Sequence, residues 1–191
     1  GGEAALFKAD VRVPAEVDAM TAEAVKRWGS VDVLINNAGL TKDGLLVRMS
    51  EQDWDDVLDT NLTGPFHCMR SAGEAMMKQG AGHIINIASI VGVQGREGQA
   101  NYSASKSGLI GLTKAAAREW GPYNIKVNAV LPGYLPTDMG AAASDAVRER
   151  VVKENALGRV SAPTEVAEFI YRLSLMNNVS GQMFNLDSRV L

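Results

Sequence analysis

The amino-acid sequence predicts an α/β protein built on a parallel sheet with helices on both faces. Short apolar segments alternate with longer segments of helical periodicity along the 191 residues, the order expected when crossover helices join parallel strands. Residues 82–88 (GHIINIA) are almost continuously apolar, which is typical of a strand covered on both faces. The chain length, with 46% hydrophobic and 21% charged residues, predicts one globular domain over residues 1–191.

Composition also argues against several function classes. The formal net charge is -3, so the chain as a whole offers no basic surface for nucleic acid. No apolar segment approaches the roughly 20 residues needed to span a membrane, and no signal peptide is recognisable. We therefore expect no membrane partner and a cytoplasmic location. The single cysteine, Cys68, lies in an apolar helical context and is expected to be a reduced core thiol.

The first part of the chain predicts a strand, a helix and a second strand. Residues 4–8 form a short apolar run and predict the first strand. Pro14 lies in the first turn of a helix that has one apolar stripe and ends at Gly29. Residues 31–36 are rich in branched side chains and predict the next strand, which leads into residues 37–39.

A long helix is expected from about residue 50 to residue 79, with a break near Gly64 and its neighbouring proline. Ser50 fits the N-cap position, with Asp53 three residues later. Asn61 lies in the middle of this segment, although asparagine is only a modest helix former. The simplest interpretation of Asn61 is a solvent-facing side chain.

The second half of the chain continues the alternation. The strand over 82–88 leads into a loop with three glycines, and then into a helix that carries Tyr102 and ends at Gly121. Branched residues predict a further strand over 125–131. The remaining expected elements are a helix at about 144–155 inside a variable segment 134–158, a helix over 162–176 and a strand over 181–186.

Polar and small residues follow the predicted strands. In parallel sheets, ligands bind in the crevice outside the carboxyl ends of the strands. We therefore expect Asp10, residues 36–39, Ser89 and the pair Pro132–Gly133 to converge on one edge of the sheet. The helix that contains Tyr102 follows Ser89 by a short loop and belongs near the same edge.

Tyr102 and Lys106 are four residues apart, which places both side chains on one face of a helix. An ammonium group beside a phenol favours the phenolate, so we expect the pKa of Tyr102 to fall below its ordinary value of about 10. Tyr102 would then be a proton donor or acceptor near neutral pH. The alternative is a half-buried tyrosine beside a solvated lysine, with no chemical role.

Several motifs together resemble the short-chain dehydrogenase/reductase family. Ser89 at a strand end is followed by Tyr102 13 residues later and by Lys106 four residues after that. The other matching motifs are NNAG at 36–39, Asn61 in the long helix, and Pro132–Gly133 followed by Thr137. The resemblance extends over most of the chain. It implies a Rossmann-type doubly wound parallel sheet in a three-layer α/β/α arrangement.

The resemblance also implies catalytic roles for these residues. Tyr102 would give a proton to the alkoxide of a reduced ketone, and Lys106 would lower the pKa of Tyr102 and contact the nicotinamide ribose. Ser89 would hydrogen-bond the carbonyl oxygen and stabilise its developing charge. Asn61 would hold a water that links Lys106 to solvent. The alternatives are that Ser89 only caps its own backbone and that Asn61 only supports neighbouring backbone.

A nicotinamide cofactor is implied by the same resemblance. Asp10 would contact the adenine, residues 37–39 would line the path of the ribose and phosphates, and Leu135 would contact the carboxamide end through its backbone. The Pro132–Gly133 pair has the alternative of an ordinary turn. The full expected set is Asp10, Val11, Asn37, Ala38, Gly39, Tyr102, Lys106, Pro132, Gly133, Leu135 and Thr137.

One part of the family pattern does not occur in this sequence. Family members begin with a strand, a glycine-rich turn T-G-x-x-x-G-x-G that binds the pyrophosphate, a helix and a second strand. No glycine lies between Gly2 and Gly29. We therefore expect a partial Rossmann domain lacking this strand-helix-strand, with roughly 50 further residues upstream. The residues that select NAD or NADP belong to that segment. NADP is expected from the most similar subfamily, with NAD as the alternative.

The substrate expectation comes from three segments that are most similar to the β-ketoacyl-acyl carrier protein reductases of this family. These are residues 98–114, 125–133 and 181–187. The resemblance implies an NADPH-dependent reduction of a 3-oxoacyl thioester, on acyl carrier protein or coenzyme A, in fatty acid biosynthesis. An acidic carrier protein would favour basic residues near the mouth of the site, of which Arg48, Arg96 and Arg159 are candidates.

Two other functions stay open at this point. A lid at about 134–158 would select the substrate, so another ketone or secondary alcohol (a sugar, steroid, polyol or acetoacetyl-CoA) is the first alternative. A non-catalytic homologue that acts by binding is the second. No metal is expected. The helices over 51–79 and 101–120 and the end of the chain, 182–191, resemble the interfaces of family tetramers and imply a homotetramer.

Overall fold

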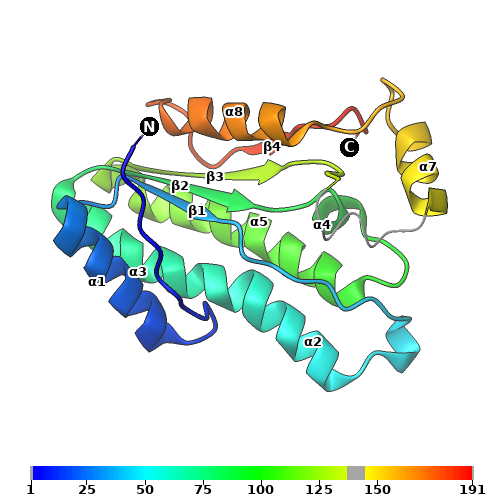
Figure 1. Ribbon diagram of the computed structural model, residues 1–191, viewed down its shortest axis with the longest axis horizontal. Coiled ribbons are helices and arrows are strands. Elements are labelled where there is room, and N and C mark those ends of the chain that lie inside the picture. The colour runs from blue at the N-terminus through cyan, green and yellow to red at the C-terminus, as the bar shows by residue number, and fades with distance from the viewer. Residues whose placement is uncertain (1, 137–144, 191) are drawn as a thin grey trace.

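In the computed structural model, which describes residues 2–136 and 145–190, four strands form one parallel sheet (Figure 1). The strands are hydrogen-bonded in chain order: β1 (Val33–Asn36), β2 (Gly82–Ile87), β3 (Ile125–Leu131) and β4 (Met183–Asn185). The register brings Asn36 of β1 beside Asn86 of β2. Because all neighbours are parallel, each pair is joined by a crossover that contains helix.

Helices lie on both faces of this sheet (Figure 1). One face is covered by α3 (Gly64–Gln79) and α5 (Ala100–Trp120), with α1 (Pro14–Trp28) packed on α3, and the other face is covered by α8 (Pro163–Ser174). The shorter helical elements are α2 (Glu51–Leu58), α4 (Val91–Gln94), α7 (Asp145–Glu154), and 3-10 turns at Leu46–Arg48 and Gly121–Tyr123. The three layers confirm the predicted α/β/α arrangement.

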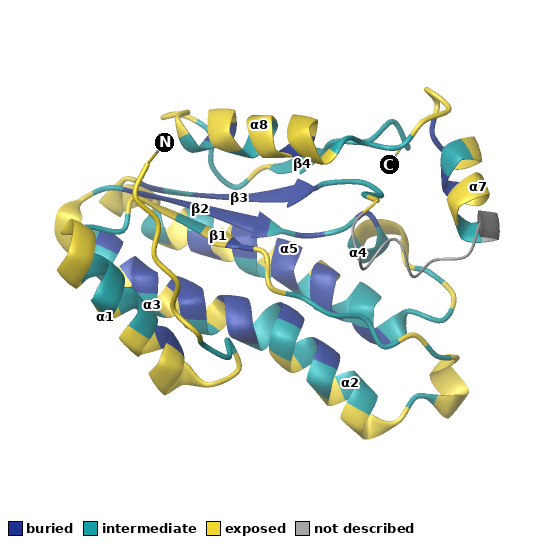
Figure 2. Ribbon diagram, in the orientation of Figure 1, coloured by how far each residue is buried: buried dark blue, intermediate teal, exposed yellow. Residues whose placement is uncertain are grey.

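Apolar side chains of β2 and β3 form the core on both faces of the sheet, and Figure 2 shows these two strands as its most buried part. Ile84 is fully buried in a cluster with Met76 of α3. Its neighbour Ile85 points to the opposite face and clusters with Leu173 of α8. Successive residues therefore serve opposite layers, which is why the strand sequence is almost continuously apolar.

The strand expected at residues 4–8 is wrong. The structure has no strand over residues 2–10, and the side chain of Leu6 is fully exposed. In the described residues no strand pairs with the other edge of β1, so the backbone of residues 2–10 does not join the sheet. The chain docks differently: Val11 packs against Gly64 of α3, where an added Cβ would lie 2.6 Å from Val11 Cγ2.

The long helix expected over 50–79 is interrupted, as predicted, by a π-helical turn at Asp59–Thr63. In this turn the backbone N–H of Gly64 bonds to the carbonyl of Asp59, five residues earlier. Pro65 follows and has no N–H to give to the preceding helical turn. The extra residue in the turn rotates the following helix relative to α2 and turns Asn61 inward.

Helix ends follow the sequence signals. Pro14 occupies the first turn of α1, and Gly29 ends the helix with a left-handed φ of 84°. The hydroxyl of Ser50 accepts the backbone N–H of Asp53 at 3.1 Å, as an N-cap does. No helix in the described ranges is both long and apolar enough to cross a membrane. Cys68 is buried as expected, and burial raises the pKa of its thiol.

The buried His83 of β2 predicts a pH dependence of stability. Its Nδ1 lies 3.1 Å from the carbonyl oxygen of Ser174, and its Nε2 lies 3.4 Å from Nδ2 of Asn128. Burial lowers the pKa of His83 below its ordinary value of 6.5. The unfolded chain therefore binds this proton more readily, so the free energy of unfolding should fall as the pH drops from about 6.5 through the folded-state pKa. Urea denaturation across this pH window measures the effect.

A His83→Gln variant should lose this part of the pH dependence, because glutamine has no proton to gain. His67→Gln removes an imidazole from α3 and is the matched control, because this variant should retain the pH dependence that His83 causes. Equal pH slopes for the unaltered protein and His83→Gln would contradict the prediction.

Candidate active site

The carboxyl ends of the strands and the first turns of α5 lie on the same side of the molecule (Figure 1). Ser89 follows the end of β2, and Tyr102 and Lys106 lie in the first two turns of α5. The short helix α4, between Ser89 and Tyr102, packs tightly on α5. An added Cβ on its Gly92 would lie only 2.7 Å from the backbone carbon of Lys106. This packing brings the serine to the tyrosine.

The Tyr102 phenol is largely withdrawn from solvent, and burial raises its pKa above the ordinary value of 10. A side-chain hydrogen bond with Ser89 acts in the lowering direction, and the Asp43 carboxylate acts in the raising direction. The expected net fall in the pKa of Tyr102 is therefore wrong, because burial outweighs the effect that lowers it. The ammonium nitrogen of Lys106 lies over the Tyr102 ring, 5.6 Å from its centroid. The phenol is protonated at neutral pH, as a proton donor must be.

Lys106 is not a solvated surface lysine. Its side chain is buried at 5% exposure, and Nζ donates a hydrogen bond to the carbonyl oxygen of Ile87 at 2.7 Å. Burial lowers the pKa of Lys106 to about 8. The residue therefore stays mainly cationic at neutral pH, and its charge lies at the end of β2.

Ser89 has two side-chain contacts. Its oxygen accepts the backbone N–H of Val91 at 3.2 Å, so Ser89 does cap its own backbone, as the alternative interpretation expected. The same side chain also acts on the Tyr102 phenol, where it lowers the pKa. A hydroxyl has one donor and two acceptor positions, so capping leaves the Ser89 proton available for a second oxygen.

Asn61 is fully buried and joins the loop after β1 to α5. Its Oδ1 accepts the N–H of Leu40 at 2.9 Å, and its Nδ2 donates to the carbonyl of Leu40 at 2.9 Å and to Oγ of Ser105 at 3.3 Å. Ser105 in turn donates to the carbonyl of Tyr102 at 2.9 Å. The solvent-facing interpretation of Asn61 is therefore wrong, and support of neighbouring backbone is observed.

The loop after β1 approaches these residues through Gly39. A Cβ at this position would lie 3.2 Å from Oδ1 of Asn61 and 3.7 Å from Nζ of Lys106. Glycine thus lets the backbone of the loop come close to the two side chains. Asn37 and Ala38, the residues before it, are exposed.

A hollow of about 440 Å³ brings together part of the expected cofactor-binding set. Asp10, Val11 and Ala38 line it, together with Lys8, Ala9 and Glu16. Side-chain hydrogen bonds from Arg12 lower the pKa of Asp10 to about 2, so this carboxylate is charged at neutral pH. The hollow is open to solvent beside the end of β1 and offers space for a flat polar group.

Pro132 and Gly133 follow the end of β3, on the other side of Ser89. Gly133 has a left-handed φ of 81°, and an added Cβ would lie 2.7 Å from Cβ of Asp187 and 2.8 Å from Oγ of Ser161. Glycine is therefore required at residue 133 for two reasons: the left-handed φ of the turn and the close approach of Asp187 and Ser161. Leu135 is half-buried, and Thr137 lies outside the described residues.

Comparison with known proteins agrees with this geometry. A family model described as short chain dehydrogenase matches residues 1–148. The chain belongs to the short-chain dehydrogenase family. Relatives include 3-oxoacyl-[acyl-carrier-protein] reductases FabG of Staphylococcus aureus (48% identical) and Staphylococcus epidermidis (49%), each over 89% of this chain and 69% and 70% of the relative. The Thermotoga maritima FabG is 42% identical over 90% of this chain and 71% of its own length.

This short-chain dehydrogenase also has buried polar residues at the site that sequence analysis missed. Asn101 lies in the first turn of α5: its Oδ1 accepts the N–H of Tyr102 at 2.8 Å, and its Nδ2 donates to the carbonyl of Lys42 at 3.0 Å. Ser105, one turn later, bonds Asn61 as described above. The available signal was the four-residue spacing of Asn101 and Ser105, which places both side chains on one face of α5.

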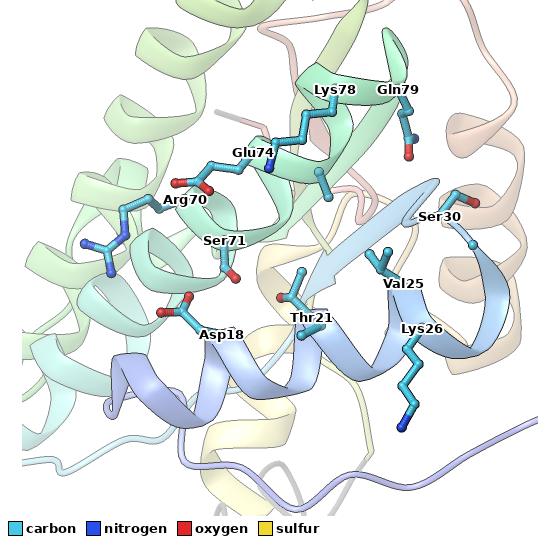
Figure 3. Close-up of a pocket in the computed structure, with 13 residues that line it drawn as sticks. Asp18, Thr21, Val25, Lys26, Ser30, Arg70, Ser71, Glu74, Lys78 and Gln79 are labelled. Carbon is cyan, nitrogen blue, oxygen red and sulfur yellow. The ribbon is translucent and has the colours of Figure 1, made fainter.

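A larger hollow, of about 990 Å³, lies away from this site in the groove between α1 and α3 (Figure 3). Acidic Asp18 and Glu74 alternate there with basic Lys26, Arg70 and Lys78. None of the residues expected to bind cofactor or substrate lines it. The mixed charges do not select a ligand of either sign, so we assign the chemistry to the strand-end site.

Replacing Asn61 with alanine should destabilise the protein. The substitution leaves the N–H and carbonyl of Leu40 without their buried partner, which costs about 2 kcal/mol of unfolding free energy. Urea denaturation measures the loss. Asn177→Ala removes an exposed amide from the turn after α8 and is the matched control, with a change within about 0.5 kcal/mol. Equal effects of the two substitutions would refute the buried role of Asn61.

Proposed function

We propose that this protein reduces 3-oxoacyl thioesters carried by acyl carrier protein to 3-hydroxyacyl thioesters, with NADPH, in fatty acid biosynthesis. The observation that supports it most is that Ser89, Tyr102, Lys106 and Asn61 lie together at the strand-end edge of the sheet. The family supplies the reaction class, a nicotinamide-dependent oxidoreduction, and relatives 42% to 49% identical carry the name of this reductase. A coenzyme A thioester is the smaller form of the same substrate.

The reduction needs a hydride at the carbonyl carbon and a proton at the carbonyl oxygen. Bound NADPH supplies the hydride. Tyr102 donates the proton: its phenolic O–H bond breaks, and the alcohol O–H bond forms. The cation of Lys106 stabilises the tyrosinate that is left. Ser89 donates a hydrogen bond to the same carbonyl oxygen and stabilises charge as it develops there.

Resupply of the proton to Tyr102 requires a path to solvent. We assign this path to a water held near Asn61 and Lys106, whose side chains both lie against Gly39. Asn61 uses both amide atoms on the backbone of Leu40, so its contribution is to fix the loop that borders this water. It therefore acts as a positioning residue.

The residues present fit a dinucleotide along the strand-end edge. The hollow lined by Asp10, Val11 and Ala38 suits the adenosine end. Asn37 and Gly39 continue from it toward Tyr102 and Lys106. Pro132, Gly133, Leu135 and Thr137 complete the proposed set at the nicotinamide end. NADP is the proposed form, because the subfamily that the sequence most resembles uses it.

Substrate selection is assigned to the chain after β3, the expected lid at about 134–158, of which residues 137–144 lie outside the described residues. Within it, α7 lies beyond the carboxyl ends of the strands (Figure 1). Arg48, Arg96 and Arg159 are candidates for contacts with an acidic carrier protein. A homotetramer is proposed to form through α2–α3, α5 and residues 182–190. The half-exposed Phe66 on α3 is consistent with such an interface, and light scattering measures the assembly.

An assay of the full-length protein with acetoacetyl thioester and NADPH tests the proposed reaction. Oxidation of NADPH that depends on the thioester is expected, and the carrier-bound form should be the better substrate. Titration of NADPH against the fluorescence of Trp28, Trp54 and Trp120 gives cofactor binding independently. Saturable binding without thioester reduction would refute the proposed substrate, and a panel of other ketones would then apply. Absence of both would favour a non-catalytic homologue.

A further inference from the structure

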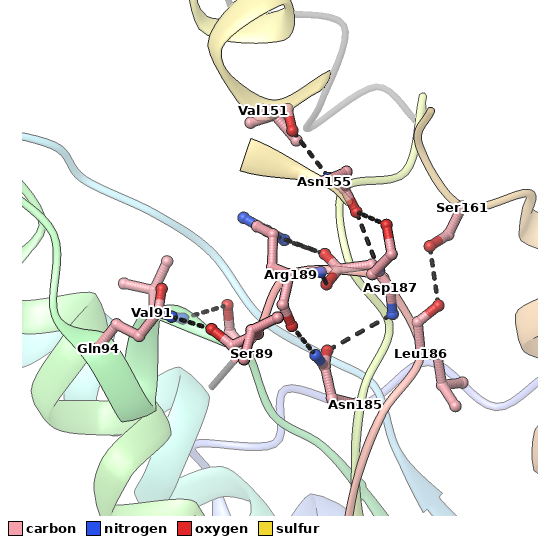
Figure 4. Close-up of polar contacts among 12 residues, drawn as sticks. Ser89, Val91, Gln94, Val151, Asn155, Ser161, Asn185, Leu186, Asp187 and Arg189 are labelled. Carbon is pink, nitrogen blue, oxygen red and sulfur yellow. Dashed lines mark hydrogen bonds and ion pairs between the residues drawn. The ribbon is translucent and has the colours of Figure 1, made fainter. Parts of the chain in front are cut away.

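The C-terminal segment, residues 185–190, lies at the strand-end edge and is bonded to elements on several sides of the site (Figure 4). Ser161, before α8, donates to the carbonyl of Leu186 at 3.0 Å. Gln94 of α4 donates to the carbonyl of Val190 at 3.2 Å. The segment thus connects the start of α8 with the short helix that follows Ser89.

Bonds within the segment hold it in one conformation. The Asp187 side chain is only 1% exposed, and its carboxylate accepts the backbone N–H of Arg189 at 3.0 Å and Nε at 2.7 Å. Asn185 donates to the carbonyl of Arg189 at 2.8 Å. Asp187 also packs against Gly133 after β3. A buried charge paired in this way is costly to separate, so the segment behaves as a rigid support.

Helix α7 is attached to this support at its carboxyl end. Asn155, which follows the helix, is 4% exposed, and its Oδ1 accepts both the N–H and the hydroxyl of Ser188 at 3.0 Å. Its Nδ2 donates to the carbonyl of Val151, inside the helix, at 2.8 Å. The hydroxyl oxygen of Ser188 accepts the N–H of Leu157 at 3.1 Å, and the N–H of Ala156 bonds to its carbonyl at 3.2 Å.

We propose that Asn155 and Ser188 are positioning residues for substrate binding. They fix α7 to the C-terminal segment, whose other end is bonded through Gln94 to the helix that follows Ser89. The distance between α7 and the catalytic serine is then set by one continuous bonded path, and the acyl thioester binds between them. The identity of the substrate in this inference rests on the proposed function, but the attachment of α7 to the C-terminal segment does not.

The test compares Asn155→Leu with the unaltered full-length protein. Leucine keeps the branched shape of the side chain and removes every side-chain bond from residue 155 to Ser188 and Val151, while the backbone N–H of residue 155 still bonds to the carbonyl of Val151. KM for the acetoacetyl thioester should rise about tenfold, the size expected for losing buried hydrogen bonds, while kcat and KM for NADPH stay within about twofold. Hydrogen–deuterium exchange should increase in α7 and not in α5. Arg150→Gln, on the exposed face of α7, is the matched control and should leave all of these unchanged.

Ser188→Ala is a milder variant for the case in which Asn155→Leu does not fold, because it retains the backbone bond to Asn155. It should change the same quantities in the same direction by a smaller factor. Faster exchange in α7 with an unchanged thioester KM would overturn the positioning role, and unchanged exchange would overturn the attachment itself. An unaltered protein that binds NADPH but does not reduce the thioester would refute the proposed function alone, and exchange would still decide the attachment.

Discussion

Replacing Tyr102 with phenylalanine is expected to lower kcat about a thousandfold while leaving NADPH binding within about twofold of the unaltered protein. The substitution removes one oxygen, and with it the proton that the product alcohol needs, and general acid catalysis of this kind contributes between about 10² and 10⁴ in rate. The ring remains, so the packing of the first turn of α5 and the contact of Lys106 with the ring face are retained. Turnover is measured from NADPH oxidation, and binding from fluorescence.

The control for this change is Tyr123→Phe. Tyr123 is half-exposed in the 3-10 turn after α5, so this substitution removes the same oxygen atom far from the site. It should leave kcat and binding unchanged. Turnover by Tyr102→Phe at the rate of this control would sink the assignment of Tyr102 as proton donor. A parallel loss of NADPH binding would instead indicate that the hydroxyl holds the cofactor.

Much of the architecture could be predicted because burial leaves a simple pattern in the sequence. β2 is apolar at nearly every position, since Ile84 and Ile85 serve opposite layers. The same pattern misleads at residues 4–8, because an apolar run becomes a strand only where it pairs with a sheet, and these residues do not pair with the edge strand β1. That requirement is a property of the whole sheet and not of the segment.

The geometry of the candidate site could likewise be predicted only in part. The convergence of Ser89, Tyr102 and Lys106 could be predicted from their spacing, because a helix turn and a strand end have fixed geometries. The rise in the pKa of Tyr102 could not, because it depends on how deeply the fold buries the phenol. Asn61 was recognised as a candidate, but its inward orientation depends on a π-helical turn, which adds one residue to a helix and has no periodic signature.

The packing of α4 on α5 brings Ser89 to Tyr102, and Gly92→Ala is expected to disrupt this packing. A Cβ at residue 92 would lie 2.7 Å from the backbone carbon of Lys106, 2.8 Å from the nitrogen of Ser107 and 2.9 Å from Cβ of Lys106. Helical backbone cannot yield as the tip of a side chain does, so α4 must move away from α5. Ser89 immediately precedes α4, so its hydroxyl moves relative to Tyr102.

A displacement of about 1 Å at a catalytic group lowers activity about a hundredfold, so kcat/KM of Gly92→Ala should fall by that order. Overpacking at a helix contact should also lower the free energy of unfolding by about 1–3 kcal/mol. The matched control is Gly121→Ala, where φ is -52° and no atom lies within 4 Å of the added Cβ. That substitution removes only backbone freedom from the unfolded chain, so it should raise stability by about 0.5 kcal/mol with unchanged kcat/KM. If Gly92→Ala behaves like Gly121→Ala, the packing of α4 on α5 does not position Ser89, and the serine must be held by its own loop.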